Sequence, residues 1–104
     1  MHARREMQSL ILHRRIAGRL LDNSEAVIGK ALENLRRWAD LSGQEPSPAN
    51  REWQEILTTR RPEEIAGLIV SDGENAARLR QSSPFAGVLS HKEVWAIKRG
   101  HEAA

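Results

Sequence analysis

Apolar residues recur along this chain at intervals of three and four, the spacing of a helix that buries one face. The first such run extends from Met7 to Leu21 and is apolar over more than one stripe. The second and clearest run places Ile28, Leu32 and Leu35 on one face. We therefore predict two long helices in the N-terminal half of the chain.

Start and stop signals divide the remaining chain into shorter helices. Start signals are caps or prolines at Asp22-x-x-Glu25, Ser47-Pro48, Pro62, Ser71-x-x-Glu74 and Ser90-x-x-Glu93. Stop signals are Gly43, after the second helix, and Gly100, after the last one. No alternating strand pattern interrupts them. The sequence predicts an all-α fold, a small bundle of about five to six helices in which two longer N-terminal helices precede shorter ones.

The length and composition limit the class of protein. A chain of 104 residues is long enough for one modest core, so we expect a single domain over residues 1–104. The absence of cysteine excludes disulfides, cysteine-ligated metals and thiol nucleophiles. The longest apolar stretch, about six residues at 65–70, is far below the ~20 that span a bilayer. With no signal-peptide pattern either, we expect a cytoplasmic protein without a membrane partner.

Positive charge is concentrated at the N-terminus, although the net charge of the chain is only +2. Residues 1–20 contain five arginines and one glutamate. Four of them, Arg4, Arg5, Arg15 and Arg19, share an arc of about 100° on the helix. This arc is a candidate face for nucleic-acid phosphates, or else an ordinary solvated helix face. Base stacking is not expected, because the three tryptophans occupy positions typical of a helical core.

Catalytic and metal-binding patterns are missing from the sequence. The histidines, His2, His13, His91 and His101, stand at none of the spacings that bring metal ligands together on a helix. His13 is interpreted as a helix-surface residue. Phosphate-binding and dinucleotide-binding glycine motifs do not occur, and no nucleophile elbow is present. We predict no catalytic residues, no metal, no cofactor and no enzymatic activity.

One segment, residues 82–89, interrupts the helices with a proline and the only phenylalanine of the chain. Pro84 keeps Ser83 out of the helical conformation, and Gly87 permits a close backbone approach. Two interpretations remain open: the segment folds back onto the core, or Phe85 anchors it in the cleft of a partner. Both interpretations hold if only one end of the segment packs onto the core and the other contacts a partner.

Three stretches of the sequence support a family resemblance. They are R-R-I-A-x-R-L-L-D at residues 14–22, E-N-L-R-R-W at 33–38 and L-R-Q-S-S-P-F-A-G-V-L-S at 79–90. Together they resemble small bacterial proteins encoded beside toxin genes, the antitoxin halves of toxin–antitoxin pairs. This resemblance implies a protein that binds and neutralises a cognate toxin enzyme.

Under this hypothesis the partner would be contacted by the last of these stretches and the helix before it. The predicted partner-binding residues are Arg78, Arg80, Ser83, Pro84, Phe85, Gly87, Val88 and Leu89. The apolar side chains among them would fill pockets on the partner, and the two arginines would pair with its carboxylates or occupy positions that substrate phosphates otherwise use. One alternative is a small DNA- or RNA-binding regulator that uses the arginine face. Another is a homo-oligomer that buries the second apolar side of the first helix.

Overall fold

The structure, a computed structural model, describes residues 2–103 of the chain and the side chains of residues 5–100. Its helices are α1 (His2–Asp22), α2 (Ser24–Ser42), α3 (Pro48–Thr59), α4 (Pro62–Ile69), α5 (Glu74–Gln81) and α6 (His91–Ala103). No strand occurs within the described range. The predicted all-α bundle, with two long helices followed by shorter ones, is confirmed.

Several predicted boundaries are confirmed by their local hydrogen bonds. The hydroxyl of Ser47 accepts the backbone N–H of Asn50 at 3.2 Å, which caps the start of α3. Glu64 accepts the backbone N–H of Arg61 at 3.1 Å, in the first turn of α4. Gly43 ends α2 with φ of 66°, a left-handed conformation in which a glycine has no Cβ to clash.

Three other predicted boundaries are wrong. Asp22 remains inside α1, and the single residue Asn23 separates α1 from α2 without a side-chain cap. Ser71 does not cap α5; its hydroxyl donates to the carbonyl of Gly67 at 2.7 Å, so it closes the preceding helix. The N-cap of α5 is instead Gly73. The last helix also continues past Gly100 to Ala103, because a lone glycine does not interrupt the backbone hydrogen bonds of a helix.

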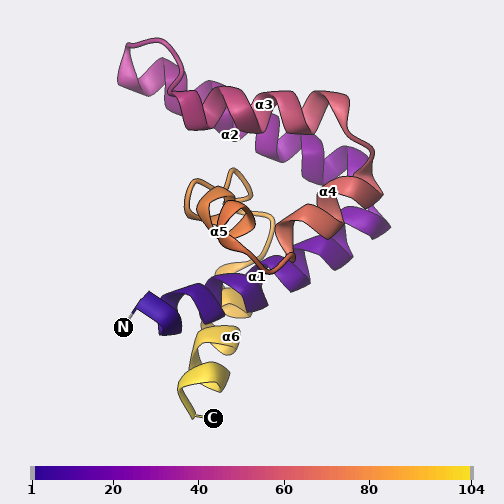
Figure 1. Ribbon diagram of the computed structural model, residues 1–104, viewed down its shortest axis with the longest axis vertical. Helices are drawn as coiled ribbons and strands as arrows, with labels where there is room; N and C mark the ends of the chain where they lie inside the picture. The colour runs from indigo at the N-terminus through magenta and orange to yellow at the C-terminus, as the bar shows by residue number, and fades with distance from the viewer. Residues whose placement is uncertain (1, 104) are drawn as a thin grey trace.

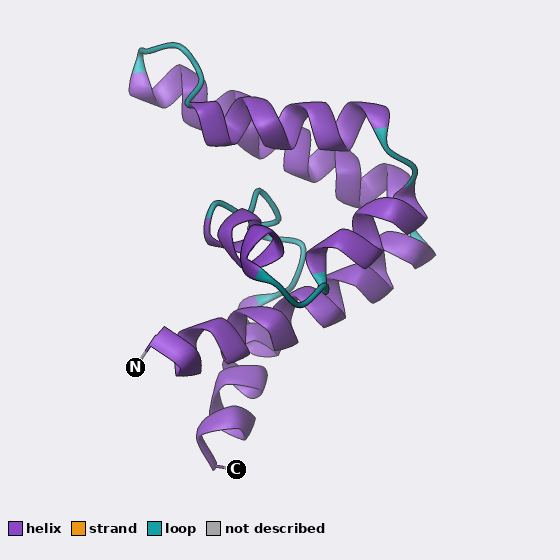
Figure 2. Cartoon of the chain, viewed as in Figure 1, coloured by secondary structure: helices purple, strands orange, loops and turns teal. Residues whose placement is uncertain are grey.

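The helices form two arms that meet near the junction of α1 and α2 (Figure 1). One arm contains α1 with α4 packed on it, and the other contains α2 with α3. Helix α5 lies between the arms, and so does the start of the connection from α5 to α6 (Figure 2). Helix α6 packs mainly against α1 and projects away from the other arm.

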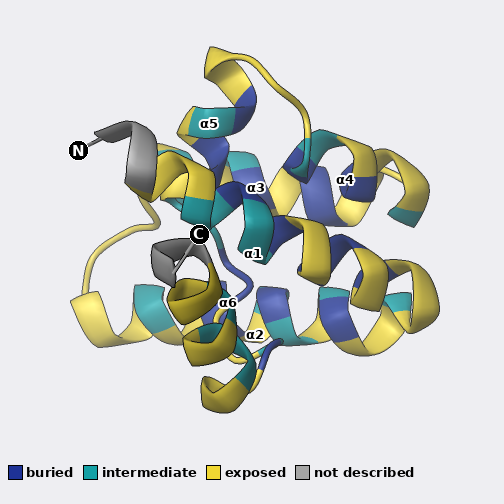
Figure 3. Cartoon of the chain, turned by 90° about the horizontal axis from the view of Figure 1, so that it is seen from below, coloured by how far each residue is buried: buried dark blue, intermediate teal, exposed yellow. Residues whose placement is uncertain are grey.

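The core occupies the space between these arms and is mostly aliphatic. Figure 3 shows buried residues along the facing sides of the helices, whereas most of α6 is exposed. The core residues with the least exposure are Leu20, Ala31, Trp53, Ile65 and Ile69. The core also includes Phe85 and Leu89, which lie outside any helix.

Candidate interaction surface

The segment after α5, the predicted docking loop, is part of the core. Pro84, Phe85 and Leu89 are buried, with Phe85 only 3% exposed. The ring of Phe85 meets the ring of Trp53 edge to face at 5.5 Å and that of His13 at 6.3 Å. These three residues therefore cannot anchor a partner, and the interpretation in which the loop folds back onto the core is correct for them.

The loop is held in place by a buried asparagine on α2. The side-chain nitrogen of Asn34 donates to the carbonyl oxygens of Pro84 at 2.9 Å and Ala86 at 2.8 Å. Its oxygen accepts from Arg37 at 3.2 Å. Sequence reasoning missed this residue, although its helical position between Ala31 and Trp38 placed a polar side chain on an apolar face.

A second buried polar group, His13, holds the loop from the side of α1. Its Nδ1 lies 2.7 Å from the carbonyl oxygen of Ser9, which can only accept, so Nδ1 carries the proton. Its Nε2 therefore accepts from the Ser83 hydroxyl at 2.9 Å. The prediction that His13 lies on the helix surface is wrong, since it is 5% exposed. Burial lowers the pKa of His13, and the nearby charge of Arg80 lowers it further, against the bond to Ser9.

Acidification is expected to destabilise the fold through His13. In the unfolded chain a histidine takes a proton near pH 6.5, whereas the folded state keeps its pKa below that value. The contribution of neutral His13 to the free energy of unfolding is therefore fully present above about pH 6.5, and it is lost as the pH drops through the lowered pKa. Urea unfolding at pH 7.5 and 5.5 measures this loss. This loss of stability should be smaller in His13→Gln but unchanged in His91→Gln, which alters an exposed histidine. Equal losses in both variants would contradict the assignment of the pH dependence to His13.

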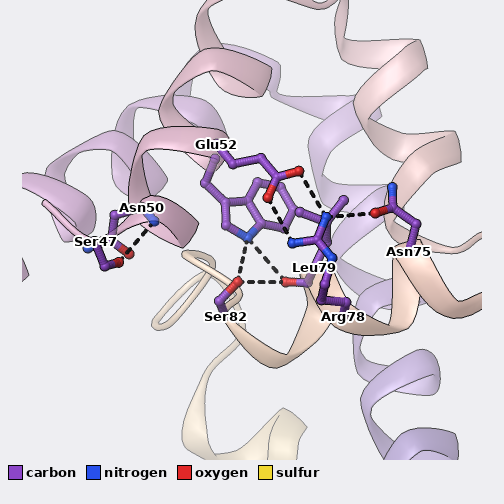
Figure 4. Close-up of polar contacts among 8 residues, drawn as sticks. Ser47, Asn50, Glu52, Asn75, Arg78, Leu79 and Ser82 are labelled. Atoms are coloured by element: carbon purple, nitrogen blue, oxygen red, sulfur yellow. Dashed lines mark hydrogen bonds and ion pairs between the residues drawn. The ribbon is translucent and has the colours of Figure 1, made fainter.

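The two predicted partner-binding arginines have different surroundings. Arg78 makes a two-pronged ion pair with Glu52, at 2.8 and 2.9 Å, and also donates to Asn75 (Figure 4). This bond holds the pKa of Glu52 below its usual value. Arg80 is instead buried, and its Nη1 donates to the carbonyls of Ile69 at 3.2 Å and Ser71 at 2.9 Å. The pairing of Arg80 with a partner's carboxylate stays a prediction, restricted to the guanidinium nitrogens that Ile69 and Ser71 leave unused.

The tryptophan of α3 also fixes the end of α5 and the start of the loop. Nε1 of Trp53 donates to the carbonyl of Leu79 at 3.1 Å and to the hydroxyl of Ser82 at 3.2 Å, and Figure 4 shows both acceptors. Of the predicted loop residues, this leaves Gly87 exposed, with Ser83 and Val88 half-buried. Gly87 has φ of 84° and lies close to the Lys30 side chain, so any other residue would be strained there.

The predicted arginine face of α1 is only partly available. Arg5 and Arg15 are exposed, as expected. Arg19 forms an ion pair with Glu93 of α6 at 2.8 Å, which joins the two helices and lowers the pKa of Glu93. The side chain of Arg4 lies outside the described residues. The structure thus assigns one of these arginines to a contact within the fold.

The most prominent exposed aromatic side chain is one that the sequence analysis placed in the core. Trp95 is 62% exposed, whereas Trp53 is fully buried. On α6, Val94 and Ile97 are half-buried and pack against the core. The opposite side carries exposed residues that we call the α6 outer face: His91, Lys92, Trp95, Lys98 and Arg99. Within residues 5–100, none of its three lysine and arginine side chains lies within 4 Å of a carboxylate.

No protein-family model, no curated protein sequence and no solved structure matches this chain. In the described part of the chain, no group of three or more histidine, aspartate or glutamate side chains is arranged to hold a metal ion. Among the same residues, no helix combines the length and the apolar character needed to cross a membrane.

Proposed function

We propose that this chain is a non-catalytic interaction module that binds and neutralises an enzyme in the bacterial cytoplasm, as antitoxins do, and that it docks through the α6 outer face. The exposure of Trp95 among three cations is the observation that supports this proposal. The resemblance of residues 14–22, 33–38 and 79–90 to antitoxins suggests the class of partner.

The side chains of this face have the chemistry of a protein-binding surface. Tryptophan and arginine are the residues most enriched among those that contribute most of the binding energy at interfaces. A large exposed tryptophan gains free energy when a partner covers it, because its apolar surface leaves water. The surrounding Lys92, Lys98 and Arg99 favour a partner surface rich in carboxylates, and they would also accelerate its approach.

The attachment of α6 to the fold suits this role. Val94 and Ile97 pack inward, and the Arg19–Glu93 ion pair links α6 to α1. The hydroxyl of Ser90 accepts the backbone N–H of Glu93 at 3.1 Å, which caps the start of the helix as predicted. The outer face is therefore presented by an ordered helix, so little conformational entropy is lost when a partner binds.

Replacing Trp95 with alanine is expected to weaken partner binding by about 2 kcal/mol or more, about 30-fold in Kd, if this side chain is central to the interface. The partner is first captured by the tagged chain from a lysate of the source organism after nuclease treatment. Its Kd for the chain is then measured by calorimetry. Leu41→Ala is the matched control, because Leu41 is 79% exposed at the end of α2 and lies outside the proposed face.

Neutralisation itself requires a functional readout. Expression of the captured protein alone should arrest growth, and co-expression of this chain should restore it, whereas the Trp95→Ala variant should restore it poorly. A captured protein that has no effect on growth would contradict the antitoxin role. Equal Kd values for Trp95→Ala and Leu41→Ala would contradict the assignment of the α6 outer face.

A DNA- or RNA-binding regulator is the second candidate, favoured by the same exposed tryptophan. An aromatic ring between cations can stack on an unpaired base while the cations contact phosphates. The Arg19–Glu93 pair brings α6 beside α1, where Arg15 is also exposed. The affinity of such binding falls steeply with salt concentration, whereas a protein interface in which the partner covers Trp95 largely persists.

The third candidate is a homo-oligomer, to which the exposed Met7 and Leu21 of α1 would contribute. Light scattering on the free chain tests it.

A further inference from the structure

Arg80 is a buried cation that no carboxylate of residues 5–100 neutralises by direct contact. Its side chain belongs to α5, and the residue is only 9% exposed. None of the ion pairs formed within residues 5–100 includes it. Its charge reaches His13, whose pKa it helps to lower. A guanidinium stays charged under all ordinary conditions, so an unpaired one in the interior favours the binding of an anion.

Among the described residues, only one of the three guanidinium nitrogens of Arg80 makes a hydrogen bond. Nη1 donates to the carbonyls of Ile69 and Ser71 at the end of α4. Nε and Nη2 have no hydrogen-bond partner among the described residues. In that part of the chain, every side-chain nitrogen or oxygen that is fully shielded from solvent does have a partner. Arg80 also lines a hollow at the surface, so these two nitrogens are the unused part of its guanidinium in the described chain. Together they form the side-on edge of the guanidinium, whose parallel N–H groups match two oxygens of a carboxylate or phosphate.

This edge belongs to a hollow between the start of α1 and α5. The hollow has a volume of about 280 Å³ and is lined by Arg5, Glu6, Ser9, Ala77, Arg80 and Gln81. A second hollow of about 540 Å³ adjoins it and shares Glu6, Ala77 and Arg80. The second hollow also contains Asp72 and Glu74, so its lining is acidic and unfavourable to an anion. Among the described residues the first has two arginines against one glutamate, which makes it the more favourable of the two for an anion.

We propose that the hollow between α1 and α5 is a binding site for a phosphate group. Arg80 supplies its guanidinium edge at the inner end and Arg5 a second guanidinium. The hydroxyl of Ser9, which lies 3.4 Å from Nδ1 of His13, retains its own proton to donate. The amide of Gln81 is a further donor. Donors on two helices fit a tetrahedral anion with three oxygens better than a planar carboxylate with two. This site is separate from the α6 outer face and does not depend on the function proposed for it.

Inorganic phosphate is the probe that tests the site. Amide signals of the full chain are followed by two-dimensional NMR while phosphate replaces chloride at constant ionic strength and pH 7.5. We expect saturable shifts at Ser9, Ala77 and Gln81 with a millimolar Kd. Arg5→Gln should weaken binding at least threefold, whereas Arg14→Gln should leave it unchanged, because Arg14 is exposed on α1 and does not line the hollow.

A second variant and a second anion complete the test. Arg80→Lys keeps the charge but loses the two-pronged edge, so saturable binding should disappear. If that variant does not fold, the comparison of Arg5→Gln with Arg14→Gln decides. Acetate should bind more weakly than phosphate. Shifts that do not saturate, equal Kd values for the two α1 variants, or acetate binding as tightly as phosphate would each overturn the assignment.

Discussion

Phe85→Ala is expected to lower the free energy of unfolding by about 3–5 kcal/mol, a large part of the stability of a domain of this size. The ring of Phe85 is packed edge to face against Trp53 and His13, so its removal leaves a cavity that the fixed loop cannot fill. Urea unfolding, followed by circular dichroism, measures the loss. Partner affinity of the molecules that remain folded should not change.

Two further substitutions make the Phe85 result interpretable. Val88→Ala changes a half-buried side chain of the same loop and should cost about 1 kcal/mol or less. Phe85→Leu keeps most of the volume, so it provides a folded variant if Phe85→Ala does not fold. A Phe85→Ala protein of normal stability that no longer captures its partner would restore the prediction that this ring is a docking anchor.

The helices were predictable because their signals are local. Ser47-Pro48 starts α3 as the sequence indicates, since the serine hydroxyl and the following N–H groups lie within one turn. The errors occur where a local signal competes with another. Ser71 and Glu74 have the spacing of a capping box, yet the Ser71 hydroxyl donates to Gly67 behind it. Gly73 starts α5 instead, with φ of 112°, a conformation that serine rarely adopts.

The fate of the loop was not predictable from its own residues. An apolar loop has the same sequence signature whether it covers the core of its own chain or that of a partner. What decides is Asn34, which is 50 residues away and binds the carbonyls of Pro84 and Ala86. His13 was misplaced for a related reason. Its residue type suggested the surface, although its position one turn before Ala17 placed it on the buried side of α1.

The exposed residues were misjudged in the opposite direction. Trp95 was assigned to the core with Val94 and Ile97 as the apolar residues of one helix, although residues one or two apart point in different directions around a helix. In the structure those two side chains fill the short contact between α6 and α1, and Trp95 lies on the other side. A helix that packs against one neighbour has room for only a narrow buried stripe. Candidate docking residues are thus found by asking which apolar side chains the fold leaves uncovered.

Asn34→Asp is expected to destabilise the fold by about 4 kcal/mol or more, although it changes only one side-chain group. The amide nitrogen donates to two carbonyl oxygens, at 2.9 and 2.8 Å, and Asn34 is fully buried. A carboxylate has no protons to donate, so both carbonyls would lose their partner at about 1–3 kcal/mol each. The introduced charge would also be buried against two carbonyl dipoles, which adds to the cost.

The pH dependence of this variant distinguishes lost hydrogen bonds from a general loss of packing. Burial and the two facing carbonyls would raise the pKa of the introduced carboxyl above its unfolded value of about 3.9, and they outweigh the lowering by Arg37, whose side chain is exposed and contacts only the other side-chain oxygen. The protonated group can donate to one carbonyl, so its stabilising contribution is complete below that unfolded pKa and is lost as the pH rises through the raised one. The destabilisation by Asn34→Asp, measured against the unmodified chain at the same pH, should therefore be smaller at pH 4.5 than at pH 7. Asn50→Asp is the matched control, since Asn50 is half-buried in the first turn of α3, where a negative charge is favourable. Equal effects of the two substitutions would show that Asn34 does not hold the loop.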